Sequence, residues 1–159
     1  MLNTRVGDMD EKVLDTILLD AFQWLVDTFG DKSIALNKPS YSKKYSALKP
    51  FTFKHHLTLS WDYKPSRLNW YYYGQFAEYQ ACSNSIVLHC NKKHTLEFIL
   101  DVLFHEYRHT QQSMYLYHYY KVVKKINYEE HPLEIDANNF ATEQLPIFWK
   151  KYEQEVASK

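Results

Sequence analysis

His105-Glu106-Tyr107-Arg108-His109 is the stretch around which the fold and function of this chain are predicted. On an α-helix, residues four apart lie on one face, about one turn from each other. Two imidazoles at that spacing can hold a single Zn²⁺ with nitrogen–zinc bonds of about 2.0–2.1 Å. The carboxylate of Glu106 can then take a proton from the metal-activated water. The pentapeptide therefore predicts a zinc hydrolase, most simply a peptidase.

The residues before the pentapeptide place it late in an amphipathic helix. Residues 95–106 contain no Gly or Pro, and Thr95 is positioned to cap the first turn. Apolar residues recur at spacings of three and four: Leu96, Ile99, Leu103 and Tyr107. Both histidines continue the flank of this stripe that Phe98 and Val102 form, so we expect them to face inward. An inward imidazole needs a polar partner, which is either a metal ion or the backbone.

A catalytic zinc usually takes three protein ligands and leaves its fourth position to water. The candidates for the third ligand are His118, His131, Glu134 and Asp136. On a continuing helix His118 would lie half a turn out of phase with His109 and more than about 13 Å along the axis, which makes it a poor ligand. Tyr115 stands where the metzincins place their third histidine, and this excludes that class.

Glu134 is the best of these candidates because it begins a second predicted helix. His131 lies near the expected cap, and Pro132 falls in the first turn, where its missing N–H costs nothing. The small residues Ala137 and Ala141 on the buried side would let this helix approach the first one closely. The alternative is that Glu134 is an ordinary first-turn carboxylate that favours the positive end of the helix.

Other residues near Glu134 have predicted supporting roles. Asp136 lies on a different helix face and is expected to be exposed to solvent. Asn138, one turn beyond Glu134, is a candidate to orient a zinc-binding histidine. The candidates for the donor that stabilises an oxyanion are Tyr128, His131 and Arg108.

The H-E-x-x-H motif is followed some 25 residues later by Glu134-Ile-Asp-Ala-Asn-Asn-Phe-Ala141 and then by Leu145-Pro146. This pattern resembles the ImmA/IrrE-type zincin peptidases, whose third-ligand helix carries a similar Glu-x-x-Ala-Asn-x-Phe-Ala run that ends in a Leu-Pro step. The resemblance covers the last third of the chain. It implies His105, His109 and Glu134 as zinc ligands and Glu106 as general base. Tyr107-Arg108 departs from the Leu-Gly that this family prefers.

The middle of the chain resembles the SprT-like minimal zincins in the order of its strands and metal helix. Lys124 or a neighbour stands where those proteins usually place a third histidine. Small phage-encoded metallopeptidases with H-E-x-R-H-x-x-Q and a later Pro-x-Glu-Ile-(Asp/Glu)-Ala are similar to more of the chain. The zincin resemblance also implies that the strand at 85–89 pairs with an extended substrate by β-augmentation, although an ordinary core strand is the alternative.

Apolar periodicity together with these resemblances predicts an α+β fold of the minimal zincin type in a single domain, residues 1–159. It comprises an N-terminal helix, a small mixed sheet of about four strands, the active-site helix and the third-ligand helix. The N-terminal helix is expected over 11–29, closed by Gly30. Strands are expected at 33–36, 51–61, 67–79 and 84–90. A loop at 37–49, a linker at 122–130 and a C-terminal helix at 147–156 complete the prediction.

Composition limits the partners and the compartment. The formal net charge is zero, which predicts no general attraction to nucleic acid or anionic lipid and no membrane partner. Tyrosines clustered at 115–120 near lysines could stack on bases, but Tyr is also common at the edge of a core. Cys82 and Cys90 lack the CxxC spacing of zinc-binding cysteines. We expect them to be buried thiols in a reducing compartment. With no visible signal peptide or bilayer-spanning run, we expect a cytoplasmic protein.

The sequence therefore predicts a zinc-dependent metallopeptidase that hydrolyses peptide bonds of an intracellular protein. Zn²⁺ on His105, His109 and Glu134 would lower the pKa of water toward about 7. Glu106 would take the proton and later pass it to the leaving amine. The alternative is a non-catalytic or regulatory binding protein on the same scaffold, with a structural metal or none. A protease associated with nucleic acid is a third reading.

Overall fold

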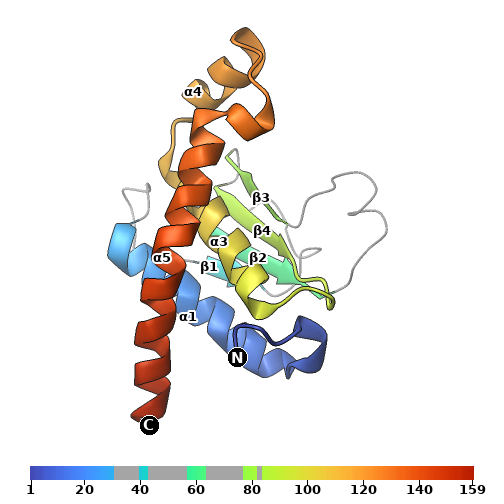
Figure 1. Cartoon of the computed structure of the whole chain (residues 1–159), viewed down its shortest axis with the longest axis vertical. Coiled ribbons are helices and arrows are strands. Elements are labelled where there is room, and N and C mark those ends of the chain that lie inside the picture. The colour runs from blue at the N-terminus through green and yellow to red at the C-terminus, as the bar shows by residue number, and fades with distance from the viewer. Residues whose placement is uncertain (31–39, 43–56, 64–76, 82–83) are drawn as a thin grey trace.

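A small mixed sheet packs against two helices, and a third, longer helix packs against one of these (Figure 1). The computed structural model describes residues 1–30, 40–42, 57–63, 77–81 and 84–159. The fold is α+β, as predicted. Among the described residues, none of the helices combines the length and the apolar character needed to cross a bilayer.

Helix α1, Glu11–Phe29, has the predicted bounds and the predicted ending. The Asp10 side chain caps it by accepting a hydrogen bond from the Lys12 amide at 2.8 Å. Gly30 ends it with a φ of 87°, a left-handed conformation that side chains with a Cβ rarely adopt. Asp15 accepts a hydrogen bond from Trp61 Nε1 at 2.9 Å, which ties the helix to the sheet.

The sheet contains four strands in the order β1-β2-β4-β3. These are β1, Ser40–Ser42; β2, Thr58–Asp62; β3, Ala77–Gln80; and β4, Ser85–His89. β1 pairs parallel with β2, β2 pairs parallel with β4, and β3 pairs antiparallel with β4. The sheet is therefore mixed, and β3 lies at one end of it among the described strands.

Two predictions about this sheet are wrong. β1 falls inside the segment 37–49 that we predicted as a loop, because a polar segment can still pair through its backbone at a sheet edge. For residues 85–89 we left two alternatives, a strand that binds substrate at the sheet edge and an ordinary core strand; β4 is an interior strand with partners on both sides, so the first alternative is wrong. Its four buried residues in a row fit that interior position. The strand predicted at 33–36 and most of those predicted at 51–61 and 67–79 lie outside the described residues.

Helix α3, Leu96–Gln111, carries the pentapeptide near its C-terminal end, as predicted. Thr95 caps it, its hydroxyl accepting a hydrogen bond from the amide three residues later. The N-terminal segment satisfies two further first-turn amides: Leu96 N donates to Thr4 O and Glu97 N to Leu2 O, both at 2.9 Å. The start of α3 is thus fixed by residues near the beginning of the sequence.

Helix α5, Pro132–Ala157, is one continuous helix of 26 residues. We predicted a ligand helix and a separate C-terminal helix from 147, and this prediction is wrong. Pro146 lies inside α5 and cannot donate the usual hydrogen bond four residues back. The helix continues because Leu145, Phe148 and Trp149 are buried on the same face on either side of the proline. Packing of that face outweighs the local cost of the missing hydrogen bond.

The linker predicted at 122–130 is also partly helical. After α3 come α4, Met114–His118; a π-helical turn η3, Tyr119–Val123; and a 3₁₀ turn η4, Tyr128–Glu130. A 3₁₀ turn η1, Val6–Asp8, precedes α1. Sequence periodicity gives little signal for segments this short.

Aromatic side chains join α1, α3 and α5 in one core. The Trp24 ring lies 5.9 Å from that of Phe104 and 5.5 Å from that of Phe148, so one α1 side chain touches both other helices. Tyr107, inside the pentapeptide, is fully buried and donates a hydrogen bond to Gly30 O. The stripe predicted on α3 therefore does face the core, and it fixes the rotation of α3 about its axis.

Pro146→Ala should stabilise the protein by about 1–3 kcal/mol, because alanine restores a helix hydrogen bond and removes the ring clash. Urea denaturation followed by circular dichroism measures the free energy of unfolding. Ile147→Ala, at an exposed neighbour in the same helix, is the matched control and should change it by less than about 0.5 kcal/mol. Destabilisation by Pro146→Ala would show that the proline is required by its surroundings.

Candidate metal centre

Three side chains from α3 and α5 converge where the two helices pack. His105 Nε2 lies 3.0 Å from His109 Nε2 and 3.5 Å from Glu134 Oε2. His109 Nε2 lies 2.6 Å from Glu134 Oε1. Donor atoms around a tetrahedral zinc are about 3.3–3.5 Å apart, so these separations are close to what one shared cation requires. The structure thus brings together the three ligands that the sequence predicted, and it identifies them as a possible metal-holding group.

The other nitrogen of each imidazole is already engaged. His105 Nδ1 lies 2.8 Å from Asn138 Oδ1, and His109 Nδ1 lies 2.7 Å from Gln112 Oε1. Amide oxygens only accept hydrogen bonds, so both Nδ1 atoms carry the proton and donate. Each Nε2 therefore faces the other ligands: it contacts Glu134, and its lone pair becomes available once a cation takes the place of the proton. The structure shows the contact that the predicted role of Asn138 requires, and the role itself stays a prediction.

A second layer of polar contacts holds Gln112 in turn. Its Nε2 donates to Leu133 O and to Asp136 Oδ2, both at 2.8 Å. Asp136 also accepts from Arg108 Nε at 2.8 Å. Asp136 was predicted to be solvent-exposed, but its side chain is only 41 % exposed because it pairs with Arg108 across the helices. Because its guanidinium is paired with Asp136, Arg108 is not available as an oxyanion donor.

The electrostatics of the group favour a bound positive charge. Burial would raise the pKa of Glu134, but hydrogen bonds from His105 and His109 hold it well below its usual range. Burial lowers the pKa of His109, yet the hydrogen bond to Glu134 and the charges of Glu106 and Glu134 raise it overall. Glu134 Oε2 is buried and, apart from the long 3.5 Å contact with His105 Nε2, lacks a hydrogen-bond partner among the described residues. A buried carboxylate oxygen of this kind is the expected state of an unfilled ligand atom.

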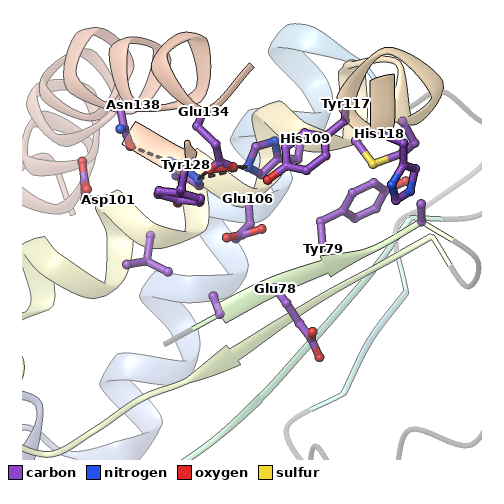
Figure 2. A pocket seen from close by; sticks show the side chains of 15 residues that line it. Glu78, Tyr79, Asp101, Glu106, His109, Tyr117, His118, Tyr128, Glu134 and Asn138 are labelled. Atoms are coloured by element: carbon purple, nitrogen blue, oxygen red, sulfur yellow. Dashed lines mark hydrogen bonds and ion pairs between the residues drawn. The ribbon is translucent and has the colours of Figure 1, made fainter. Parts of the chain in front are cut away.

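Glu106 faces a cavity of about 630 Å³ beside these ligands. Figure 2 shows its carboxylate on the side that faces β3, below Glu134 and His109. Burial raises the pKa of Glu106, whereas the two histidines and a hydrogen bond from the Tyr79 backbone amide lower it in part. A carboxyl between the ligands and a strand edge is placed to exchange protons with a molecule in this cavity.

Of the three candidates for the oxyanion donor, only Tyr128 lines this cavity. His131 caps α5: its Nδ1 accepts from Leu133 N at 3.1 Å, so Nε2 donates to Tyr117 O at 3.0 Å. Both nitrogens are occupied, which removes His131 as a ligand and as an oxyanion donor. His118 lines the cavity but does not belong to the metal-holding group.

Two residues of the site were not given a role from sequence. Gln112 lies one helical turn beyond His109, and that spacing is the signal that could have identified it. Tyr117 lines the cavity from α4, and no sequence pattern places it there. Burial and the negative charge of Glu134 raise the pKa of Tyr117 to about 12, so its hydroxyl stays protonated at neutral pH.

Comparison with family models, with curated proteins and with solved structures gives no match for this chain. The metal centre is therefore inferred from its donor atoms, their spacing and their hydrogen bonds.

Asn138→Ala should weaken zinc binding by about 10–100-fold, because His105 loses the acceptor that fixes its ring and tautomer. Competition with a zinc-chelating dye measures the affinity. Asn139→Ala, at an exposed position one residue along the same helix, is the control and should bind zinc like the parent protein. Equal affinity in both variants would mean that Asn138 does not orient the ligand.

Proposed function

We propose that this protein is a zinc-dependent metallopeptidase. The observation that carries the proposal is the convergence of two imidazole nitrogens and one carboxylate from two helices, with a fourth residue, Glu106, facing the adjoining cavity. Three ligands of nitrogen and oxygen type are what catalytic zinc sites use when one position stays open for water.

The residues present fit such an ion. The Nδ1 atoms of both histidines are engaged by amide oxygens, which leaves Nε2 for the ion, and Glu134 contributes a buried oxygen that lies 3.5 Å from His105 Nε2. When bound, Zn²⁺ supplies a Lewis acid that polarises a carbonyl and lowers the pKa of water toward about 7. No cysteine takes part in this donor set among the described residues, and Cys90 is a buried thiol elsewhere in the core.

Glu106 is the proposed general base and acid. Its carboxylate takes a proton from the attacking water and then gives it to the amine of the leaving peptide. The Tyr79 amide and the two histidines stabilise the charged form of this half-buried carboxyl, which lowers its pKa against the effect of burial.

Tyr128 and Tyr117 are the proposed donors to the oxygen that becomes negative when the carbonyl is attacked. Both line the cavity, and burial raises the pKa of both hydroxyls, with the charge of Glu134 adding to the rise. A protonated phenol close to the ligands can donate a hydrogen bond to a developing oxyanion.

An extended peptide is the proposed substrate class, and β3 replaces β4 as the strand that would bind it. Ala77, Glu78 and Tyr79 line the cavity, and the Tyr79 amide points at Glu106, so the edge of β3 that does not pair with β4 faces the site. A substrate strand on this edge would gain backbone hydrogen bonds beside the general base.

Glu106→Gln should retain one zinc per chain and lose hydrolysis by about a hundredfold or more, since the amide cannot take the proton. A mixture of synthetic peptides, with new termini identified by mass spectrometry, reports cleavage, and elemental analysis reports zinc. Glu97→Gln, on the exposed face of the same helix, is the control and should remain active. Zinc binding without cleavage by the parent protein would instead support a non-catalytic binding protein on this scaffold.

Zinc should also stabilise the fold, because its ligands come from two different helices. The gain is about 4 kcal/mol when the free zinc concentration is about a thousand times Kd. Thermal unfolding with zinc and with a chelator measures it. His105→Ala should abolish the stabilisation, whereas His118→Ala, which lines the same cavity outside the ligand set, should keep it. An equal loss in both variants would contradict the proposed ligands.

A further inference from the structure

Beside the metal centre, α4 and η3 form a helical segment over residues 114–123 whose outer face is apolar. It lies at the end of the molecule that carries α4, beyond the sheet (Figure 1). Tyr115 is 86 % exposed, Val122 62 % and Val123 66 %. We call the exposed apolar residues of this segment the outer stripe: Tyr115, Leu116, Tyr119, Val122 and Val123.

The inner face of the same segment is packed against the body of the protein. The Tyr117 ring stacks on His131 with centroids 4.1 Å apart, and the Tyr120 ring meets the same imidazole at 5.6 Å. In most surface helices the aliphatic residues face the core, whereas in this segment the valines and the leucine face outward. An exposed apolar face of this kind marks a surface that another body covers.

The charged residues in and just after the segment that carries the outer stripe are all lysines. Lys121, Lys124 and Lys125 follow one another closely, and no Asp or Glu occurs from Tyr107 to Tyr128. The Lys124 ammonium lies 6.0 Å from the centre of the Tyr119 ring, so charge and apolar surface share one side. The acidic pair Glu129 and Glu130 comes only afterwards, in the turn that leads into α5.

We propose that residues 114–125 bind the surface of an anionic membrane. Helices that lie in the bilayer interface combine an outward apolar face with flanking lysines, and tyrosine is enriched at the headgroup level. The outer stripe would enter the headgroup region while the three lysines meet anionic lipid. Zero net charge, from which we expected no such partner, is an average that conceals this local excess of positive charge.

The structure favours lipid over single-stranded nucleic acid for this surface. Base stacking needs exposed aromatic faces, but two of the four tyrosines at 115–120, Tyr117 and Tyr120, are turned inward onto His131. This leaves only Tyr115 and Tyr119 on the outer stripe. The other three residues of the outer stripe, Leu116, Val122 and Val123, are aliphatic and cannot stack. Because Tyr117 and Tyr128 line the cavity, a membrane on this face would lie close to the cavity mouth. The proposal does not depend on the metal centre or on catalysis.

The test is co-sedimentation of the full chain with vesicles of phosphatidylcholine alone or mixed in equal parts with phosphatidylserine. We expect binding to the mixed vesicles, little to the neutral ones, and weakening as salt rises. Each lysine should contribute about fivefold to the partition coefficient. The triple variant Lys121→Gln, Lys124→Gln, Lys125→Asn should therefore bind roughly a hundredfold more weakly. Asn suits position 125 because its φ is 51°.

A second variant tests the apolar part. Val122→Asp with Val123→Asp should abolish binding, whereas Ile147→Asp with Val156→Asp, two exposed aliphatic positions on α5, should keep it. Lys150→Gln with Lys151→Gln and Lys159→Gln is the control that removes the same charge elsewhere. Circular dichroism confirms that each variant is folded.

Three results would overturn the proposal. The first is no binding of the parent protein to the mixed vesicles, and the second is an equal loss in the control variants. The third is binding of single-stranded DNA, or self-association in size-exclusion chromatography, that the valine variant abolishes while vesicle binding is unchanged.

Discussion

The contact of two imidazoles with one buried carboxylate between α3 and α5 is the constraint on which the rest of the site depends. Glu134 and His109 are 3 % and 5 % exposed, so their charges cannot be screened by water. An uncompensated buried carboxylate costs several kcal/mol, and each remaining polar atom therefore needs a partner. Asn138 and Gln112 supply those partners for the histidines, and a metal ion is the partner that would satisfy all three ligands at once.

Packing of the helices brings these ligands to the same place. Tyr107 fixes the rotation of α3 because its ring is buried and its hydroxyl reaches the end of α1. Ala137 is fully buried on α5, the helix that packs against α3. The continuity of α5 through Pro146 extends the same interface away from the site. The core and the metal centre are thus two parts of one helix–helix contact.

The tyrosines that follow α3 lie in different environments. Tyr117 faces the cavity and Tyr120 packs on His131, whereas Tyr115 is almost fully exposed. The same short segment therefore closes one side of the proposed active site and presents an outer surface for a partner. Its side chains serve either role because Tyr has both an apolar ring and a polar hydroxyl.

The sequence by itself determined the helices α1 and α3, the end of α1 at Gly30, the cap of α3 at Thr95, and the ligand spacing, because these depend on neighbours within a few turns. It also indicated Glu134, through the helix start that follows His131. Only the tertiary structure decided that β4 is interior, that α5 runs through Pro146, and that Gln112 and Asp136 support His109. Those features depend on contacts between segments far apart in the chain, where packing outweighs local preference.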